Sequence, residues 1–181
     1  MGYYDDPKIV GDYIDMAAGY DGRELVAALI KFLPAGSAVL ELGMGPGVDL
    51  DLLSQRYQVT GSDASQVFLD RYREGNQAAD LLLLDAETIQ TDRRFAGIYS
   101  NKVLHHMSPE QLEASFLRQH AILLPQGIAL HSFCLGDKEE FMHGLRFQYY
   151  PEDLLLSMVA PHFRILGSIR YAEFEANDSR I

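Results

Sequence analysis

Short apolar runs alternate with longer amphipathic stretches along most of the chain from Ser37 onward. Apolar runs bounded by turn residues predict buried strands, and the stretches between them predict crossover helices that join parallel strands. The pattern therefore predicts an α/β fold with a doubly wound, mostly parallel sheet. The expected strands are 38–42, 57–62, 80–84, 95–100, 127–133 and 163–171.

Length and composition narrow the classes of protein to consider. The chain has 181 residues, 48% of them hydrophobic and 23% charged, which is typical of one soluble globular domain. No apolar run approaches the ~18 residues of a membrane span. A net charge of −11 repels phosphate backbones and anionic bilayers. We therefore expect a single domain, 1–181, that binds neither nucleic acid nor membrane.

Cysteine usage and the first residues bear on the compartment. Cys134 is the only cysteine, so the chain has no disulfide framework and no thiolate cage for a metal. The first residues lack the basic segment and apolar run of a secretory signal. These features predict a cytoplasmic protein.

A glycine-rich turn carries the first functional signal. The segment Val39-Leu-Glu-Leu-Gly-Met-Gly-Pro-Gly47 runs from a predicted strand into this turn and then into a helical stretch, 48–57. Free N–H groups in such a turn and the positive start of the helix favour an anion, and glycines let a ligand approach the backbone. Spaced glycines also occur in plain strand-to-helix turns, so the turn alone leaves the function open.

Acidic residues at the ends of the next two strands add to this signal. Asp63 follows Gly43 by 20 positions and ends the second strand, and Asp85 ends the third. Ligands of open α/β sheets bind at the carboxyl ends of the strands, where an acid accepts hydrogen bonds from ribose hydroxyls. Each acid alone is compatible with a surface cap. Together they predict an adenosine site.

Two nucleotide-binding motifs do not fit the turn. The dinucleotide fingerprint requires Gly or Ala where this chain has Val48, which weakens a nicotinamide site. No Gly-Lys-Ser/Thr follows the turn, so the phosphate-gripping loop of nucleoside triphosphatases is also absent from the sequence.

Four sequence blocks together resemble the class I S-adenosylmethionine-dependent methyltransferases, over roughly residues 13–171. The blocks are Leu40-Glu-Leu-Gly-Met-Gly-Pro-Gly47, Gly61-Ser-Asp63-Ala-Ser65, Leu84-Asp85-Ala86 and Phe95-Ala-Gly-Ile-Tyr-Ser-Asn-Lys-Val-Leu-His-His-Met107. The resemblance implies a Rossmann-like fold and S-adenosylmethionine as cofactor. Independently of the resemblance, the negative net charge attracts the sulfonium cation of that cofactor.

The resemblance also implies roles for individual residues. Gly43 and Gly45 would face the methionine moiety, Asp63 the ribose, and Asp85 and Ala86 the adenine. Glu41 would orient the turn, and Asn101 would lie beside the methyl donor. The full cofactor set implied is Glu41, Gly43, Gly45, Gly47, Asp63, Ala64, Asp85, Ala86 and Asn101.

Two adjacent histidines are the candidates for catalysis. His105 and His106 follow the fourth strand, and a neutral imidazole there could take a proton from a hydroxyl or amine acceptor. Packing or capping is the alternative role. The histidines have no third ligand at metal-like spacing, and Ser100-Asn101 lacks the acids of a magnesium-dependent site, so we predict no metal.

The acceptor is expected on the side formed by the long connection 135–150. Arg146, with aromatic neighbours that include Tyr149, would clamp a carboxylate or phosphate, or would instead pair with Glu139 or Glu140 or stack on aromatic rings. Tyr13, in an N-terminal tyrosine cluster, would close over the cofactor or simply pack. These assignments divide the domain into an N-terminal helical cap (1–36), a cofactor-binding half (37–133) and a substrate-side half (134–181).

The sequence thus predicts methyl transfer to a small-molecule acceptor by in-line displacement, with catalysis mainly by proximity. The fourth strand lacks the Asn-Pro-Pro-Tyr/Phe that family members acting on base or amide nitrogens usually carry. Two alternatives stay open: a noncatalytic S-adenosylmethionine-binding module and a nicotinamide-dependent oxidoreductase.

The end of the sequence predicts an incomplete sheet. In the resembled fold an antiparallel seventh strand lies between the fifth and sixth, but only Ser179-Arg180-Ile181 follows the Asn177-Asp178 turn. An average strand has ~5–6 residues. We therefore expect a short or missing last strand, explained by truncation or by a partner copy at this C-terminal sheet edge.

Overall fold

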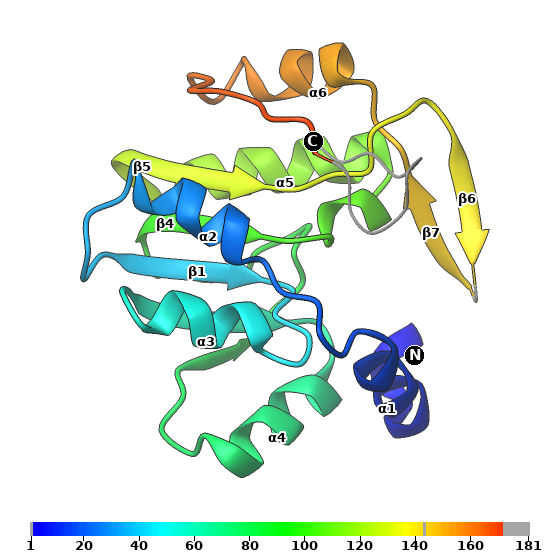
Figure 1. Cartoon of the computed structure of the whole chain (residues 1–181). Coiled ribbons are helices and arrows are strands. Elements are labelled where there is room, and N and C mark those ends of the chain that lie inside the picture. Colours follow the sequence, from blue (N-terminus) through cyan, green and yellow to red (C-terminus); the bar gives the residue numbers. More distant parts are fainter. Residues whose placement is uncertain (1, 143, 172–181) are drawn as a thin grey trace.

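The computed structural model describes residues 2–142 and 144–171. Its centre is a five-stranded sheet in the order β3-β2-β1-β4-β5, in which every neighbouring pair is parallel. The strands are β1 (Ala38–Leu42), β2 (Gln58–Asp63), β3 (Leu81–Leu83), β4 (Phe95–Ser100) and β5 (Leu123–His131). The predicted α/β fold with a doubly wound parallel sheet is confirmed (Figure 1).

Helices cover both faces of the sheet (Figure 1). Those before β3 are η1 (Tyr3–Asp5), α1 (Pro7–Met16), α2 (Arg23–Ile30), α3 (Val48–Ser54) and α4 (Gln66–Gly75). Those after β4 are η2 (Leu104–His106), α5 (Pro109–Ile122) and α6 (Glu152–Val159). Ser108 caps α5 in a reciprocal capping box with Gln111, as its sequence predicts.

The core consists of two layers separated by the sheet. On one face, Leu29 of α2 and Leu53 of α3 pack with Val39 of β1. On the other face, Leu40 of β1 packs with Ile98 of β4 and Ile122 at the end of α5. Alternate residues of β1 thus contribute to opposite layers, which fixes which side chains at its carboxyl end face which helices.

The carboxyl ends of β1 and β4 form the point where strand order reverses. The chain proceeds from β1 outward to β3 on one side and then returns to β4 and β5 on the other. Crossovers leave in opposite directions at such a switch point, so a crevice opens there in open α/β sheets. The glycine-rich turn after β1 lies at this point.

Two strand predictions need correction. Residues 163–170 form no strand, because their apolar side chains find no ladder in the described part of the chain: Ile165, Leu166 and Ile169 are 40%, 47% and 66% exposed. The fifth strand begins at Leu123 rather than at 127, and Pro125–Gly127 forms an irregular register shift within it. The predicted last strand and the sheet edge it would complete fall on residues 172–181, outside the described residues.

The long connection after β5 is not a simple loop. It contains an antiparallel two-stranded sheet, β6 (Glu139–Met142) and β7 (Leu145–Gln148), that projects beside the carboxyl ends of the main strands (Figure 1). This hairpin contacts η2.

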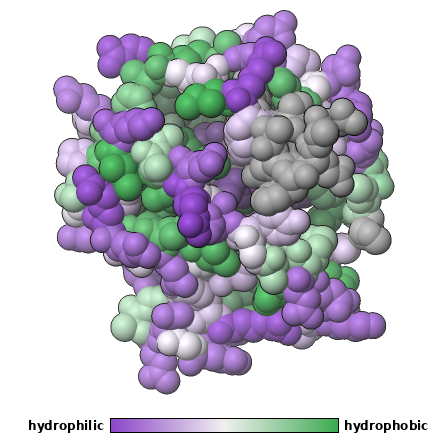
Figure 2. All heavy atoms as spheres, in the orientation of Figure 1, coloured by the Kyte–Doolittle hydropathy of each residue, from purple (hydrophilic) through white to green (hydrophobic). Residues whose placement is uncertain are grey.

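The visible face of the molecule is mostly hydrophilic, with smaller hydrophobic patches between the polar residues (Figure 2). Among the helices of the described residues, each is too short or too polar to cross a membrane.

Candidate active site

The glycine-rich turn is tied to the end of the neighbouring strand by Asp63. Its Oδ2 accepts a hydrogen bond from the Gly45 amide at 2.9 Å, and its Oδ1 accepts one from the Ser65 amide at 2.8 Å. The side chain is only 9% exposed. Burial raises the pKa of Asp63, and the backbone hydrogen bonds partly offset that effect. Asp63 therefore holds the turn after β1 against the end of β2.

The three glycines of the turn have left-handed backbones, with φ of 67° at Gly43, 50° at Gly45 and 85° at Gly47. A Cβ on Gly43 would lie 2.5 Å from Val103, and one on Gly47 would lie 2.3 Å from the Tyr72 ring. A Cβ on Gly45 would meet only the Tyr13 ring, at 3.9 Å. Gly43 and Gly47 thus allow close packing within the protein, and the side of the turn at Gly45 is the more open.

Glu41 is buried at the carboxyl end of β1. It is 3% exposed, and its Oε2 has no hydrogen-bond partner within the described residues. Burial raises the pKa of Glu41 well above its usual value, and the nearby charges of Asp49, Asp63 and Asp51 raise it further. An orphaned buried carboxyl oxygen surrounded by acids is a natural partner for a cationic ligand.

Asp49, in the first turn of α3, was not anticipated from the sequence. Its Oδ1 accepts from the Gly22 amide at 2.6 Å, and its Oδ2 accepts from the Tyr99 hydroxyl at 2.7 Å and from Asn101 Nδ2 at 3.0 Å. Asn101 Oδ1 in turn accepts from the Ser132 hydroxyl at 2.7 Å. One buried carboxylate thus connects α3, the start of α2 and the ends of β4 and β5.

Two signals in the sequence point to this network. An acidic residue directly after a glycine-rich turn lies in the first turn of a helix, where the macrodipole favours it. A tyrosine inside a buried strand needs a partner for its hydroxyl, as Tyr99 does here. The structure adds the pairing of Asp49 with Tyr99, across 50 positions of sequence.

The third strand contributes Asp85 and Ala86 to the same edge of the sheet. Asp85 is exposed, and its Oδ1 accepts from the amides of Glu87 and Thr88 at 2.8 and 3.0 Å. The Ala86 carbonyl accepts from the Ser115 hydroxyl at 2.6 Å. Among the described residues, Asp85 Oδ2 accepts no hydrogen bond, and Ala64 after β2 is exposed, so polar groups remain available along this edge.

Two N-terminal tyrosines, Tyr4 and Tyr13, lie beside the glycine-rich turn and the end of β2. The Tyr13 ring lies 5.4 Å from that of Tyr4 and 5.7 Å from that of Phe68, measured between centroids. The Tyr4 carbonyl accepts from the Ser65 hydroxyl at 2.6 Å. Burial raises the pKa of Tyr13, and the charges of Asp63 and Asp49 raise it further. The N-terminal segment is thereby anchored beside Asp63.

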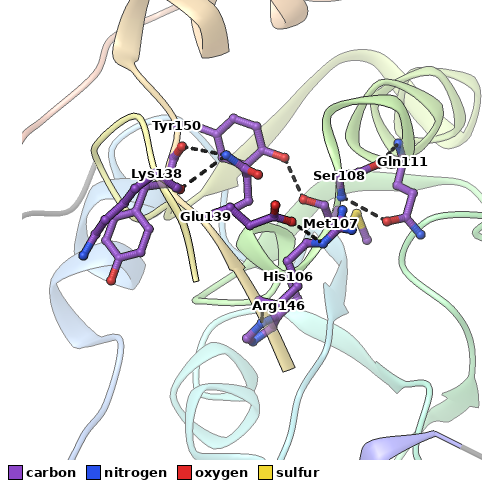
Figure 3. Close-up of polar contacts among 10 residues, drawn as sticks. His106, Met107, Ser108, Gln111, Lys138, Glu139, Arg146 and Tyr150 are labelled. Atoms are coloured by element: carbon purple, nitrogen blue, oxygen red, sulfur yellow. Dashed lines mark hydrogen bonds and ion pairs between the residues drawn. The ribbon is translucent and has the colours of Figure 1, made fainter. Parts of the chain in front are cut away.

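The two histidines have different surroundings. His105 is 3% exposed, and its Nδ1 lies 3.3 Å from Cys134 Sγ. His106 Nδ1 lies 2.6 Å from the Arg146 carbonyl oxygen, and because a carbonyl only accepts, this nitrogen carries the hydrogen (Figure 3). Nε2 of neutral His106 therefore bears the lone pair. Burial lowers the pKa of His106, with partial compensation from the bond to Arg146.

Further contacts fix the hairpin over η2. The Phe147 ring lies 4.7 Å from the His106 ring, between centroids. Tyr150, two residues before α6, is fully buried and donates from its hydroxyl to the Met107 carbonyl at 2.8 Å (Figure 3). The orientation of His106 thus depends on the hairpin.

The Arg146 guanidinium pairs within the hairpin. Its Nε lies 2.9 Å from Glu139 Oε1, and its Cζ lies 5.7 Å from the centroid of Phe141. The Tyr149 ring faces Lys138, whose Nζ is 4.4 Å from the ring centroid. The structure thus has the pairing of Arg146 with Glu139 that the sequence left as an alternative.

No group of three or more His, Cys, Asp or Glu side chains within the described residues is arranged to hold a metal ion.

Residues 39–127 match a protein family described as a methyltransferase domain. No curated protein matches the chain by sequence. Among solved structures, an S-adenosylmethionine-dependent methyltransferase from Clostridium acetobutylicum superposes with a TM-score of 0.74 at 13% identity, covering 96% of this chain and 95% of that chain.

Two further solved structures have the same fold. The 1,6-didemethyltoxoflavin-N1-methyltransferase of Burkholderia thailandensis has a TM-score of 0.77 at 21% identity, covering 96% of this chain and 81% of that chain. The glycopeptide N-methyltransferase MtfA has a TM-score of 0.72 at 15% identity, covering 90% and 93%. At these identities the likenesses establish a common fold.

Proposed function

We propose that the chain, whose residues 39–127 match a methyltransferase domain, transfers a methyl group from S-adenosylmethionine to a small-molecule acceptor. The hydrogen bond from the Gly45 amide to Asp63 carries this proposal, because it holds the open side of the turn against the acid expected to bind the ribose. The structural neighbours add support: the toxoflavin enzyme was solved with S-adenosylhomocysteine and MtfA with S-adenosylmethionine.

The residues at the carboxyl ends of the strands fit this cofactor. Its sulfonium and ammonium cations suit a site where Glu41 and Asp63 are buried acids. Asp85 and Ala86 would take the adenine, and Asp63 and Ala64 would border the ribose. Gly43, Gly45 and Gly47 would give the ligand access to the backbone, and Asn101, oriented by Asp49, would lie beside the methyl group.

When bound, S-adenosylmethionine supplies an electrophilic methyl group, which an acceptor lone pair takes as the carbon–sulfur bond breaks and a neutral thioether forms. The chain must hold the acceptor in line at about 3–3.5 Å and exclude water. Tyr13, anchored beside the turn by Tyr4 and Phe68, would exclude water from the cofactor side.

His106 is the better of the two histidines for accepting a proton from the acceptor. Its Nε2 bears the lone pair, and its lowered pKa keeps the ring neutral near pH 7. His105, buried against Cys134 and Phe147, would position His106.

Arg146 and Tyr149 would form the outer wall of the acceptor pocket. The N-terminal segment 1–36 would act as a cap, 37–133 as the cofactor half and 134–181 as the substrate half, in a cytoplasmic enzyme.

The test is turnover with a panel of small amines, ring nitrogens, phenols and carboxylates, with S-adenosylhomocysteine and methylated product detected by mass spectrometry. We expect product that depends on one class of acceptor. Binding of S-adenosylmethionine without turnover of any class would favour a noncatalytic binding module. Absence of binding would contradict the proposal.

A further inference from the structure

Glu41 differs from the other acids around the glycine-rich turn. It is on β1, and the acids whose charges act on it are Asp49 and Asp51 on α3 and Asp63 at the end of β2. A charge on Glu41 would raise the pKa of Tyr99 of β4 and of Tyr72 of α4. No ion pair within the described residues involves Glu41. Among the described residues, the titratable groups that these electrostatic interactions link to Glu41 are thus acids or phenols.

The two neighbouring buried carboxylates have the donors that an anion needs. Asp63 accepts from the amides of Gly45 and Ser65, one at each oxygen. Asp49 accepts from one backbone amide and from the side chains of Tyr99 and Asn101. Glu41 Oε2, in contrast, is buried without a partner in the described part of the chain. Of the three, Glu41 is the group least able to hold a negative charge before a ligand arrives.

We propose that Glu41 is protonated in the cofactor-free protein and loses its proton to solvent when the methyl donor binds with its sulfonium and ammonium groups. This inference rests on the proposed function. The carboxyl O–H bond breaks, the proton goes to water or buffer, and the carboxylate that remains is balanced by the positive charges of the ligand. No group is oxidised or reduced.

This linkage has two consequences. The affinity for S-adenosylmethionine rises with pH while Glu41 of the free protein is protonated, by up to about tenfold per pH unit for one proton released. S-adenosylhomocysteine has lost the sulfonium charge, so it stabilises the carboxylate less and releases fewer protons. The ratio of the two affinities therefore increases with pH, which favours exchange of product for fresh cofactor.

Calorimetric titration counts these protons directly. S-adenosylmethionine and S-adenosylhomocysteine are titrated in turn into the full chain at several pH values between 5 and 7. Each titration is repeated in buffers with different heats of protonation. An α-amino group has an ordinary pKa of about 7.7–8.0. The amino group of the ligand is therefore already charged over this pH range and does not account for the protons released. The variants are Glu41→Gln, which imitates a protonated carboxyl, and Glu74→Gln, the same change at an exposed position of α4.

We expect wild type and Glu74→Gln to release protons on binding S-adenosylmethionine, and Glu41→Gln to release fewer. Because the glutamine is neutral, the cofactor-free Glu41→Gln protein should unfold at the same or a higher denaturant concentration than wild type at pH 7. Equal proton counts in wild type and Glu41→Gln at every pH would overturn the inference and leave the proposed function intact. If Glu41→Gln did not fold, the wild-type protein alone would still test the inference. Release of the same number of protons on binding S-adenosylmethionine and S-adenosylhomocysteine would overturn it. Absence of binding would instead contradict the proposed function.

Discussion

The Gly45 amide donates a hydrogen bond to Asp63 Oδ2 over 2.9 Å, which joins the turn after β1 to the end of β2. Asp63→Asn removes the charge and replaces one acceptor oxygen with an NH2 group, which cannot accept. Because hydrogen bonds to charged groups contribute ~1.5–3 kcal/mol, we expect the affinity for S-adenosylhomocysteine to fall about 10- to 100-fold. Calorimetry measures it. Asp70→Asn, the same change at an exposed position of α4, serves as control, and equal affinities in both variants would remove Asp63 from the site.

Glycine at position 47 is required by both backbone and packing. Gly47→Ala places a Cβ at φ 85° and 2.3 Å from the Tyr72 ring, which is held by a hydrogen bond to Asp51. Strain and overpacking together predict a loss of about 2–5 kcal/mol in the free energy of unfolding. Gly36→Ala, at φ 77° with open space around it, should lose only about 1–2 kcal/mol. Urea unfolding compares the two variants. Equal losses in the free energy of unfolding would show that the Tyr72 ring moves aside at little cost.

We expect His131 of β5 to make the folded protein less stable in acid. Its Nδ1 lies 2.8 Å from the Ser100 hydroxyl, its Nε2 is buried without a partner among the described residues, and burial lowers its pKa to about 3. Between this value and the ordinary 6.5 the unfolded state binds more protons than the folded state, so stability is complete above about pH 6.5 and falls as pH falls. We expect His131 to account for about 3 kcal/mol of loss between pH 7 and pH 4.

The measurement is urea unfolding of wild type and His131→Asn across that range. Asparagine keeps a polar group near Ser100 and does not titrate, so the variant should lose less stability on acidification than wild type. Parallel profiles would mean that His131 is not the group responsible.

If His106 is a general base, its substitution should change the rate of methyl transfer and the pH dependence of that rate. His106→Asn keeps a donor for the Arg146 carbonyl and removes Nε2, and with a proton-bearing acceptor kcat should fall about 10²- to 10⁴-fold. The wild-type rate should fall in acid, with an inflection below pH 6.5 because burial lowers the pKa of His106. The asparagine variant should lack this inflection. If the variant kept kcat and lost only thermal stability, the histidine would be a packing residue.

The parallel sheet and the cofactor edge could be predicted because their signals are local. The strand β1 is a short apolar run followed at once by spaced glycines, and Asp63 lies directly at the end of β2. The register that brings Asp63 to Gly45 follows from parallel pairing of adjacent strands, which the alternation of strands and helices implies.

The remaining features depend on contacts that the sequence pattern does not encode. The hairpin β6–β7 lies on the surface, with Phe141 65% exposed, so its residues lack the burial that makes an alternating pattern visible. The segment 163–171 has the apolar composition of a strand, but a strand also needs a neighbour to pair with. The Asp49 network combines residues from four elements, and no spacing rule links Asp49 to Tyr99.

Amide hydrogen exchange with and without S-adenosylhomocysteine tests most directly whether the cofactor binds at the Gly43–Asp63 edge. We predict that millimolar ligand slows exchange in peptides that cover 41–50, 61–68 and 84–89, and leaves the outer strand β6 unchanged. Protection confined to 139–148, or no protection anywhere at saturating ligand, would contradict a cofactor site at the carboxyl ends of β1, β2 and β3.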